Sequence, residues 1–266
     1  MATNLWTDVD ALARLADITR TVESPAAAGG DVAGDAWLPD NLESPGVEIG
    51  SAELPARVVS GDFHAAFRLS EDTLALTIGD ISGKGVPAGV LRAFTASMVR
   101  SVSSFSASPE DVLSRVNAMI CGARLEALYA TIFLGWLDLP TGRLRYANAG
   151  HPRPFRIAPD RSVRPFGEVT GPILGILDNV SFGAGEEWLE SGEAIVLYTD
   201  GVTEARNAAG RFIGPRGLSL LLERHARKSA GSLCAAIAEA IDARAGSLLH
   251  DDVTLLAARF RGALSA

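Results

Sequence analysis

The apolar positions of the chain first follow a helical period and later fall into short runs typical of strands. Residues 5–22 predict one amphipathic helix, with its apolar face formed by Leu5, Val9, Leu12, Leu15 and Ile18. Residues 23–36 are small, rich in Gly and Ala, and without a period, so we expect a linker there. The helix could bind a partner, or it could pack on the domain or exchange between two copies. The pattern favours neither reading.

Three short runs rich in strand formers follow, and then two helices. We expect strands at 47–54, 63–69 and 73–82, and helices at 86–102 and 108–126. The second helix has the clearer start, because Ser108 can cap it, Pro109 suits its first turn and Asp111 stands at its third position.

Strand patterns then return, and two late helices precede a final strand. Residues 130–139 and 143–150 flank Pro140-Thr141-Gly142, which predicts a β-hairpin. We expect further strands at 154–158, 180–189 and 193–200, helices at about 214–228 and 231–245, and a last strand at 251–260. Since strands and helices come in blocks, the pattern favours an α+β fold of antiparallel sheets covered by helices. The expected division is 1–36, helix and linker, and 37–266, one folded domain.

Composition and charge exclude several classes of protein. A chain of 266 residues with 47% hydrophobic and 21% charged residues can form a sizeable core, so it is not wholly disordered. The net charge of −8 argues against a nucleic-acid binder, which needs basic patches. No apolar run is long enough to span a membrane, and no secretory signal opens the chain. With two cysteines, Cys121 and Cys234, the chain is expected in the reducing cytoplasm.

Four aspartates share one setting, at the edge of an apolar run and beside a glycine or another aspartate. They are Asp62, Asp80, Asp200 and Asp251. Each alone could be an ordinary turn residue. On converging strands, however, four carboxylates could hold a pair of Mg²⁺ or Mn²⁺ ions, which prefer oxygen ligands and often serve the hydrolysis of phosphate esters.

The glycine-rich turn around Lys84 does not fit a phosphate-binding P-loop. Only three residues separate Gly79 from Gly83, and Gly85 stands where the motif needs Ser or Thr. Asp80 within the turn would also repel phosphate oxygens. A P-loop nucleotide hydrolase is therefore excluded.

Five segments of the chain occur in a characteristic order: SGDFHAAF, LALTIGDISGKGVPAGVL, YATIFLGWLDLPTGRLRYANAGHPRPF, IVLYTDGVTEARNAAGRFIG and HDDVTLLAARF. Together they resemble the SpoIIE/RsbU branch of the PPM family, the metal-dependent protein Ser/Thr phosphatases. The resemblance covers about residues 37–261. It implies an αββα sandwich of two mainly antiparallel sheets between helical layers, with a site for two Mn²⁺ or Mg²⁺ ions at one edge.

The resemblance also implies a set of metal ligands. It assigns this role to the carboxylates of Asp62, Asp80, Asp200 and Asp251 and to the main-chain carbonyl of Ile81. Asp252 is expected to support the site or to cap a turn.

Three positions depart from the pattern of related proteins. Ala65 and His64 stand where branch members commonly have an aspartate and an aromatic residue, and we expect a modest effect on the support of the site. Ser82 replaces a histidine that eukaryotic relatives use as general acid, which leaves that role unassigned. His151 is typical of the branch and could orient substrate or move a proton, although a hydrogen-bonded link between a loop and the core is the favoured reading.

Other polar residues have ordinary interpretations. We expect Lys84 to be a solvated loop residue and assign no function to His225 or His250. Cys121 lies on an apolar helical face and is expected in the core.

The implied activity is hydrolysis of phosphoserine or phosphothreonine by a water that two metal ions activate. Usual substrates of the branch are phosphorylated STAS-domain anti-anti-sigma factors of bacterial partner-switching pathways, which regulate sigma factors in stress responses. The helix at 5–22 could serve an activator or self-association. A pseudophosphatase that only binds partners, and a hydrolase of small phosphate esters, remain the alternatives.

Overall fold

The computed structural model describes residues 43–44, 46–56, 60–82, 86–123, 129–206, 210–245 and 249–262. The helix expected at 5–22, the linker at 23–36 and Lys84 lie outside these residues. Within them, no helix combines the length and the apolar character that a membrane crossing requires.

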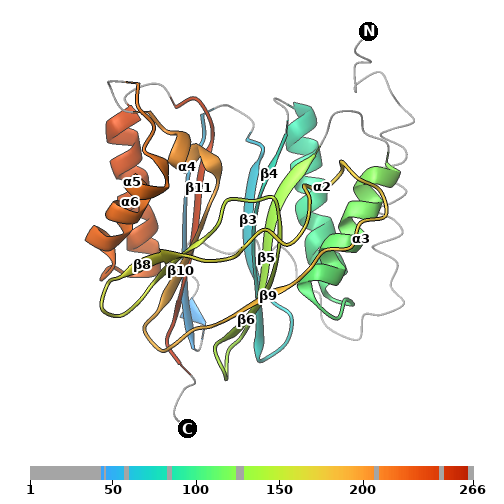
Figure 1. The fold of residues 1–266 in the computed structure, drawn as a ribbon, viewed down its shortest axis with the longest axis horizontal. Coiled ribbons are helices and arrows are strands. Elements are labelled where there is room, and N and C mark those ends of the chain that lie inside the picture. Colours follow the sequence, from blue (N-terminus) through green and yellow to red (C-terminus); the bar gives the residue numbers. More distant parts are fainter. Residues whose placement is uncertain are drawn as a thin grey trace.

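Two antiparallel sheets form the middle of the molecule (Figure 1). The first has six strands, in the order β1 (Glu43–Ser44), β2 (Val47–Leu54), β11 (Val253–Phe260), β10 (Ala194–Tyr198), β7 (Phe155–Ile157) and β8 (Val163–Pro165). The second has five, in the order β3 (Asp62–Arg68), β4 (Thr73–Ile81), β5 (Ala130–Asp138), β6 (Arg143–Ala149) and β9 (Gly185–Trp188).

Helices cover the outer face of each sheet (Figure 1). On the second sheet lie α2 (Val86–Ser103) and α3 (Pro109–Gly122), and on the first lie α5 (Gly214–His225) and α6 (Ala230–Ala245). A short helix, α4 (Asp200–Glu204), follows β10. The molecule is thus the expected αββα sandwich.

Three apolar layers hold the sandwich together. Between the sheets pack residues such as Leu76, Phe133 and Leu256, all fully buried. Separate clusters join each sheet to its own helices, for example through Leu113 and Ile237. Because inner strands are covered on both faces, they read as continuous apolar runs instead of alternating ones.

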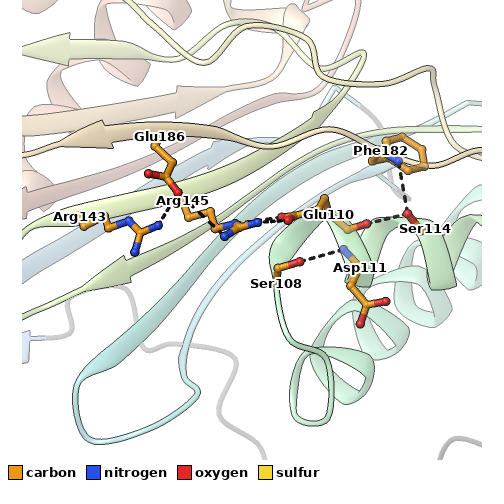
Figure 2. A network of polar contacts seen from close by, with 8 residues as sticks. All are labelled: Ser108, Glu110, Asp111, Ser114, Arg143, Arg145, Phe182 and Glu186. Carbon is orange, nitrogen blue, oxygen red and sulfur yellow. Dashed lines mark hydrogen bonds and ion pairs between the residues drawn. The ribbon is translucent and has the colours of Figure 1, made fainter.

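Polar contacts fix α3 against the edge of the second sheet (Figure 2). The Ser108 hydroxyl accepts the Asp111 backbone N–H at 3.3 Å, which confirms the predicted cap. Arg145 of β6 is paired with Glu110 of α3 and lies 3.9 Å from Glu186 of β9. These contacts join α3 to the second sheet. They involve none of the four aspartates.

Most predicted elements are confirmed, and three strands are shorter than expected, two of them next to the predicted aspartates. The strand expected at 193–200 ends at Tyr198, because Asp200 begins α4. The strand expected at 251–260 starts at Val253, so that Asp251 precedes it. The strand expected at 180–189 is limited to β9. The structure also contains β1, β8 and α4, which the apolar pattern did not predict.

Candidate active site

Asp62 and Asp80 face each other across two neighbouring strands. They are directly opposite in the register of β3 and β4. Gly61 makes this close arrangement possible, since a Cβ there would lie 2.7 Å from the Ile81 carbonyl oxygen and 3.2 Å from an oxygen of the Asp80 carboxylate. Like charges directly opposite on a sheet are destabilising, so the pair needs a compensating partner.

Asp200 and Asp251 come from the other sheet. Asp200 begins α4 directly after β10, and Asp251 lies just before β11. Gly201 allows the two segments to touch, because a Cβ at this position would lie 1.9 Å from the Asp252 carbonyl oxygen. The contact places the start of α4 against the turn that carries Asp251.

The carboxylates influence one another electrostatically. Burial, followed by repulsion from Asp200, Asp251 and Asp252, raises the pKa of Asp80 to about 7. Burial also raises the pKa of Asp62 to about 8, with a further increase from Asp80 and Asp252. The structure therefore brings the four predicted aspartates together at one edge of the sandwich, two from each sheet.

Thr199 links the two sheets at this point. Its hydroxyl donates to Asp62 Oδ2 at 2.7 Å and accepts the Thr254 backbone N–H at 3.0 Å, and its side chain is fully buried. Thr199 is not among the residues that the sequence predicts for the site. The only signal was its place immediately before Asp200, where a buried polar residue ends an apolar strand.

Asp252 supports the site through hydrogen bonds to the backbone near Asp62. Its carboxylate accepts the backbone N–H of Ala56 at 2.7 Å and that of Gly61 at 3.3 Å. It thereby links the backbone of Ala56 and of Gly61 to the start of β11. Its contacts agree with the supporting role expected for it.

Ile81 and Ser82 follow Asp80 at the end of β4. The Ile81 side chain is buried in the core, so only its main chain can serve the site. The Ser82 hydroxyl accepts the Tyr129 backbone N–H at 2.8 Å, and the Ser82 N–H donates to the Tyr129 carbonyl at 2.8 Å. These bonds connect the end of β4 to the start of β5.

His64 and Ala65, which differ from the family pattern, follow Asp62 on β3. His64 Nδ1 lies 2.9 Å from the Glu53 carboxylate of β2. This contact joins the two sheets. Ala65 pairs with Thr77 of β4. The contact between His64 and Glu53 provides a local polar link in the segment where branch members have other residues.

His151 is a buried structural residue. Its side chain is 1% exposed, and Nδ1 lies 3.0 Å from the hydroxyl of Thr131, the residue paired with Asp80 across β4 and β5. Its backbone N–H donates to Asn148 Oδ1 at 2.8 Å. Burial lowers the pKa of His151 to about 3, so the imidazole is neutral at physiological pH. This supports the reading of His151 as a link between loop and core.

The prediction for Cys121 was wrong in part. Cys121 is only partly buried, with its sulfur 3.7 Å from the Leu177 carbonyl oxygen, whereas Cys234 is fully buried. The helical face that carries Cys121 meets the segment around Leu177 at its margin, which leaves the thiol near the surface.

The chemistry of the site fits hard divalent cations. Five carboxylates lie near one another, and among the described residues none of them forms an ion pair with a basic side chain. Buried carboxylates without a cationic partner are costly, and Mg²⁺ and Mn²⁺ prefer such oxygens. As the side chains stand, no group of three or more His, Cys, Asp or Glu residues in the described part forms a ready-made metal cage.

The chain is similar in sequence to one protein family and to several known proteins. The family model described as Stage II sporulation protein E (SpoIIE) matches residues 70–261. Protein IcfG of Synechocystis is 32% identical over 238 residues, which cover 79% of this chain and 37% of that protein. Phosphoserine phosphatase RsbU of Bacillus subtilis is 29% identical over 213 residues, which cover 80% of this chain and 63% of RsbU.

A solved structure of the RsbU and RsbW domains of Rv1364c from Mycobacterium tuberculosis shares the fold. It superposes with a TM-score of 0.71 at 28% identity, over 83% of this chain and 63% of that one. The chain thus spans less than two thirds of the length of each of these relatives.

Proposed function

Because this chain belongs to the SpoIIE/RsbU branch of the PPM phosphatase family, we propose that it hydrolyses phosphoserine or phosphothreonine in a partner protein. The observation that carries the proposal is the convergence of Asp62, Asp80, Asp200 and Asp251 from two sheets, with burial and mutual repulsion acting on Asp80. An acidic cluster of this kind has no evident structural purpose, because it destabilises the fold in the absence of cations.

We assign the ion-holding role to the four aspartates and to the main-chain carbonyl of Ile81. Two divalent ions, Mn²⁺ or Mg²⁺, would supply positive charge to the phosphoryl oxygens and a water of lowered pKa as the nucleophile. Asp80 is the candidate for a ligand shared by both ions, since its carboxylate interacts with aspartates of both sheets.

The remaining residues of the chain hold this arrangement in place. Thr199 orients the Asp62 carboxylate through its 2.7 Å hydrogen bond, and Asp252 fixes the backbone before Asp62. The contact of Gly201 with Asp252 sets the position of α4 and hence of Asp200. A dinuclear site needs this precision, because small displacements of ligands weaken both binding and turnover.

The substrate class follows from family membership. The usual substrates of the branch, phosphorylated STAS-domain proteins of bacterial partner-switching pathways, are the class we propose for this chain. The reaction would then take place in the cytoplasm and affect sigma-factor regulation. Residues 5–22 are the proposed segment for an activator or for self-association, with 1–36 as a separate unit from 37–266.

The first test is phosphate release from an aryl phosphate in the presence of Mn²⁺ or Mg²⁺. We expect turnover that chelator abolishes and that Asp80→Asn lowers by orders of magnitude. Asp242→Asn, which alters an exposed carboxylate of α6, is the matched control and should be unaffected. Wild-type turnover by folded Asp80→Asn would overturn the assignment.

A phosphorylated STAS-domain protein then separates the alternatives. Faster hydrolysis of the phosphoprotein than of the aryl phosphate supports a protein phosphatase, whereas hydrolysis of the small ester alone supports a small-molecule hydrolase. Absence of turnover with either substrate, from folded protein in any divalent metal, supports a pseudophosphatase that acts by binding.

A further inference from the structure

A cavity of about 270 Å³ opens beside the candidate active site. Its walls include Asp251 of the carboxylate cluster and Gly201, which follows Asp200, and continue to Ala205, Arg206, Phe212 and His250. A group bound in this cavity would lie next to a phosphate held at the aspartates. The volume suits one or two amino-acid side chains.

One wall of the cavity is formed by the guanidinium of Arg206, which stacks on the ring of Phe212. The guanidinium carbon of Arg206 lies 4.2 Å from the centroid of the Phe212 ring. The two residues pair in an isolated β-bridge, and Arg206 Nη1 donates to the Gly210 carbonyl at 3.3 Å. The Ile213 N–H donates to the Ala205 carbonyl at 2.9 Å. The guanidinium is thereby held in position before any ligand arrives.

The carboxylates of Glu204 and Asp251 line the cavity together with Arg206, but neither forms an ion pair with it. Arg206 forms no ion pair within the described part of the protein, and its contacts there are the Phe212 ring and the Gly210 carbonyl. It stands at the surface of a chain whose net charge is −8. A stacked guanidinium leaves N–H donors free at its edge, and a carboxylate matches their geometry with two parallel hydrogen bonds.

The exposure of Phe212 also indicates that a ligand binds in the cavity. Its side chain is 53% exposed, although it is large and apolar. The partly buried Leu249 lies across the same cavity. Exposed apolar surface beside a fixed cation is typical of sites that receive a polypeptide with both an apolar and a charged contact.

From these observations we propose that the cavity receives the polypeptide next to the phosphorylated residue of the substrate, and that Arg206 recognises an acidic side chain there. The inference rests on the proposed phosphatase function and adds a specificity-determining residue to it. The occupant is a protein substrate because Asp251 lines the cavity, so a polypeptide that presents its phosphate to the aspartates can extend into it.

The test compares synthetic phosphoserine peptides that contain a single glutamate, placed in turn at each position near the phosphoserine, with matched glutamine peptides. For the wild type we expect kcat/KM to be about five- to tenfold higher for the best glutamate peptide than for its glutamine partner. Arg206→Ala should abolish this preference, and Arg206→Glu should reverse it towards a lysine peptide. Arg224→Ala, an exposed arginine of α5 outside the cavity, is the control and should keep it.

An aryl phosphate separates failure of this inference from failure of the proposed function. It carries no flanking polypeptide, so its turnover should be equal in the wild type and in Arg206→Ala. If Arg206→Ala loses this turnover while remaining folded, Arg206 acts in the reaction itself and the inference is wrong. A glutamate preference that persists in Arg206→Ala, or that is absent in the wild type, also overturns it.

Binding provides a readout that needs no turnover. Fluorescence anisotropy of the labelled glutamate peptide should give weaker binding to Arg206→Ala than to the wild type in the presence of chelator. Equal affinities of the two proteins for both peptides would overturn the inference even if no phosphatase activity were found.

Discussion

Neutralising Asp62 should stabilise the metal-free protein while it destroys the site. Asp62 is 4% exposed, and it faces Asp80 directly across the sheet. In Asp62→Asn the carbonyl oxygen can still accept the hydrogen bond that the Thr199 hydroxyl donates, and the amide can donate towards Asp80. The substitution keeps the shape of the side chain and removes its charge.

The magnitude follows from the pKa of Asp62, which burial raises from 3.8 to about 8. Between these values the folded protein holds a proton that the unfolded chain has released. The free energy of unfolding therefore falls as pH rises through this window, by up to about 1.4 kcal/mol per pH unit. Below pH 4 both states are protonated and the penalty is absent, whereas at pH 8 it approaches about 5 kcal/mol.

The assay is thermal unfolding of the wild type and Asp62→Asn in chelator, at pH 4 and at pH 8. We expect similar Tm values at pH 4 and a Tm of Asp62→Asn that is about 10–20 °C higher at pH 8. Mn²⁺ should narrow the difference at pH 8, because one ion held at 100 times its Kd stabilises the wild type by about 2.7 kcal/mol, roughly half of the penalty. An equal difference in Tm at both pH values would refute the reasoning.

Two further substitutions test how the site is held. Thr199→Val removes the donor to the Asp62 carboxylate and should weaken Mn²⁺ binding about tenfold or more, measured by titration calorimetry, whereas Thr199→Ser should restore it. Unchanged affinity in Thr199→Val would contradict its positioning role. Gly201→Ala places a methyl group 1.9 Å from the Asp252 carbonyl oxygen, so Tm and aryl phosphate turnover should both fall. Gly122→Ala, where a Cβ meets nothing within 4 Å, is the control and should leave both unchanged.

The fold could be predicted from the sequence because its elements obey local rules. The apolar runs, the cap at Ser108 and the turn at Gly142 each specify their own segment, and the structure confirms them. The start of α4 could not be predicted in this way, because Asp200 continues an apolar strand pattern. The start of α4 is accompanied instead by the close approach of Gly201 to the backbone of Asp252, which are far apart in sequence.

The aspartates of the candidate site could be predicted from the sequence. The residues that hold them in position were harder to predict. Asp62 and Asp80 are marked by adjacent glycines, and the register of their strands brings them together. Thr199 gave no comparable signal, since a threonine at the end of a strand is common. Its role arises only when the two sheets pack, because its hydroxyl bonds to one sheet and its backbone belongs to the other.

The position of the cluster explains how the fold tolerates it. Each pair of aspartates is attached to a different sheet, and each sheet is fixed by its own apolar layer to its own helices. Repulsion between the two pairs therefore acts across the join between sheets, where the central apolar layer and the hydrogen bond between Thr199 and Asp62 oppose it. Cations bound there would remove the repulsion, so metal binding and the packing of the two sheets should be thermodynamically linked. Mutations that loosen the central layer should accordingly lower metal affinity without touching a ligand.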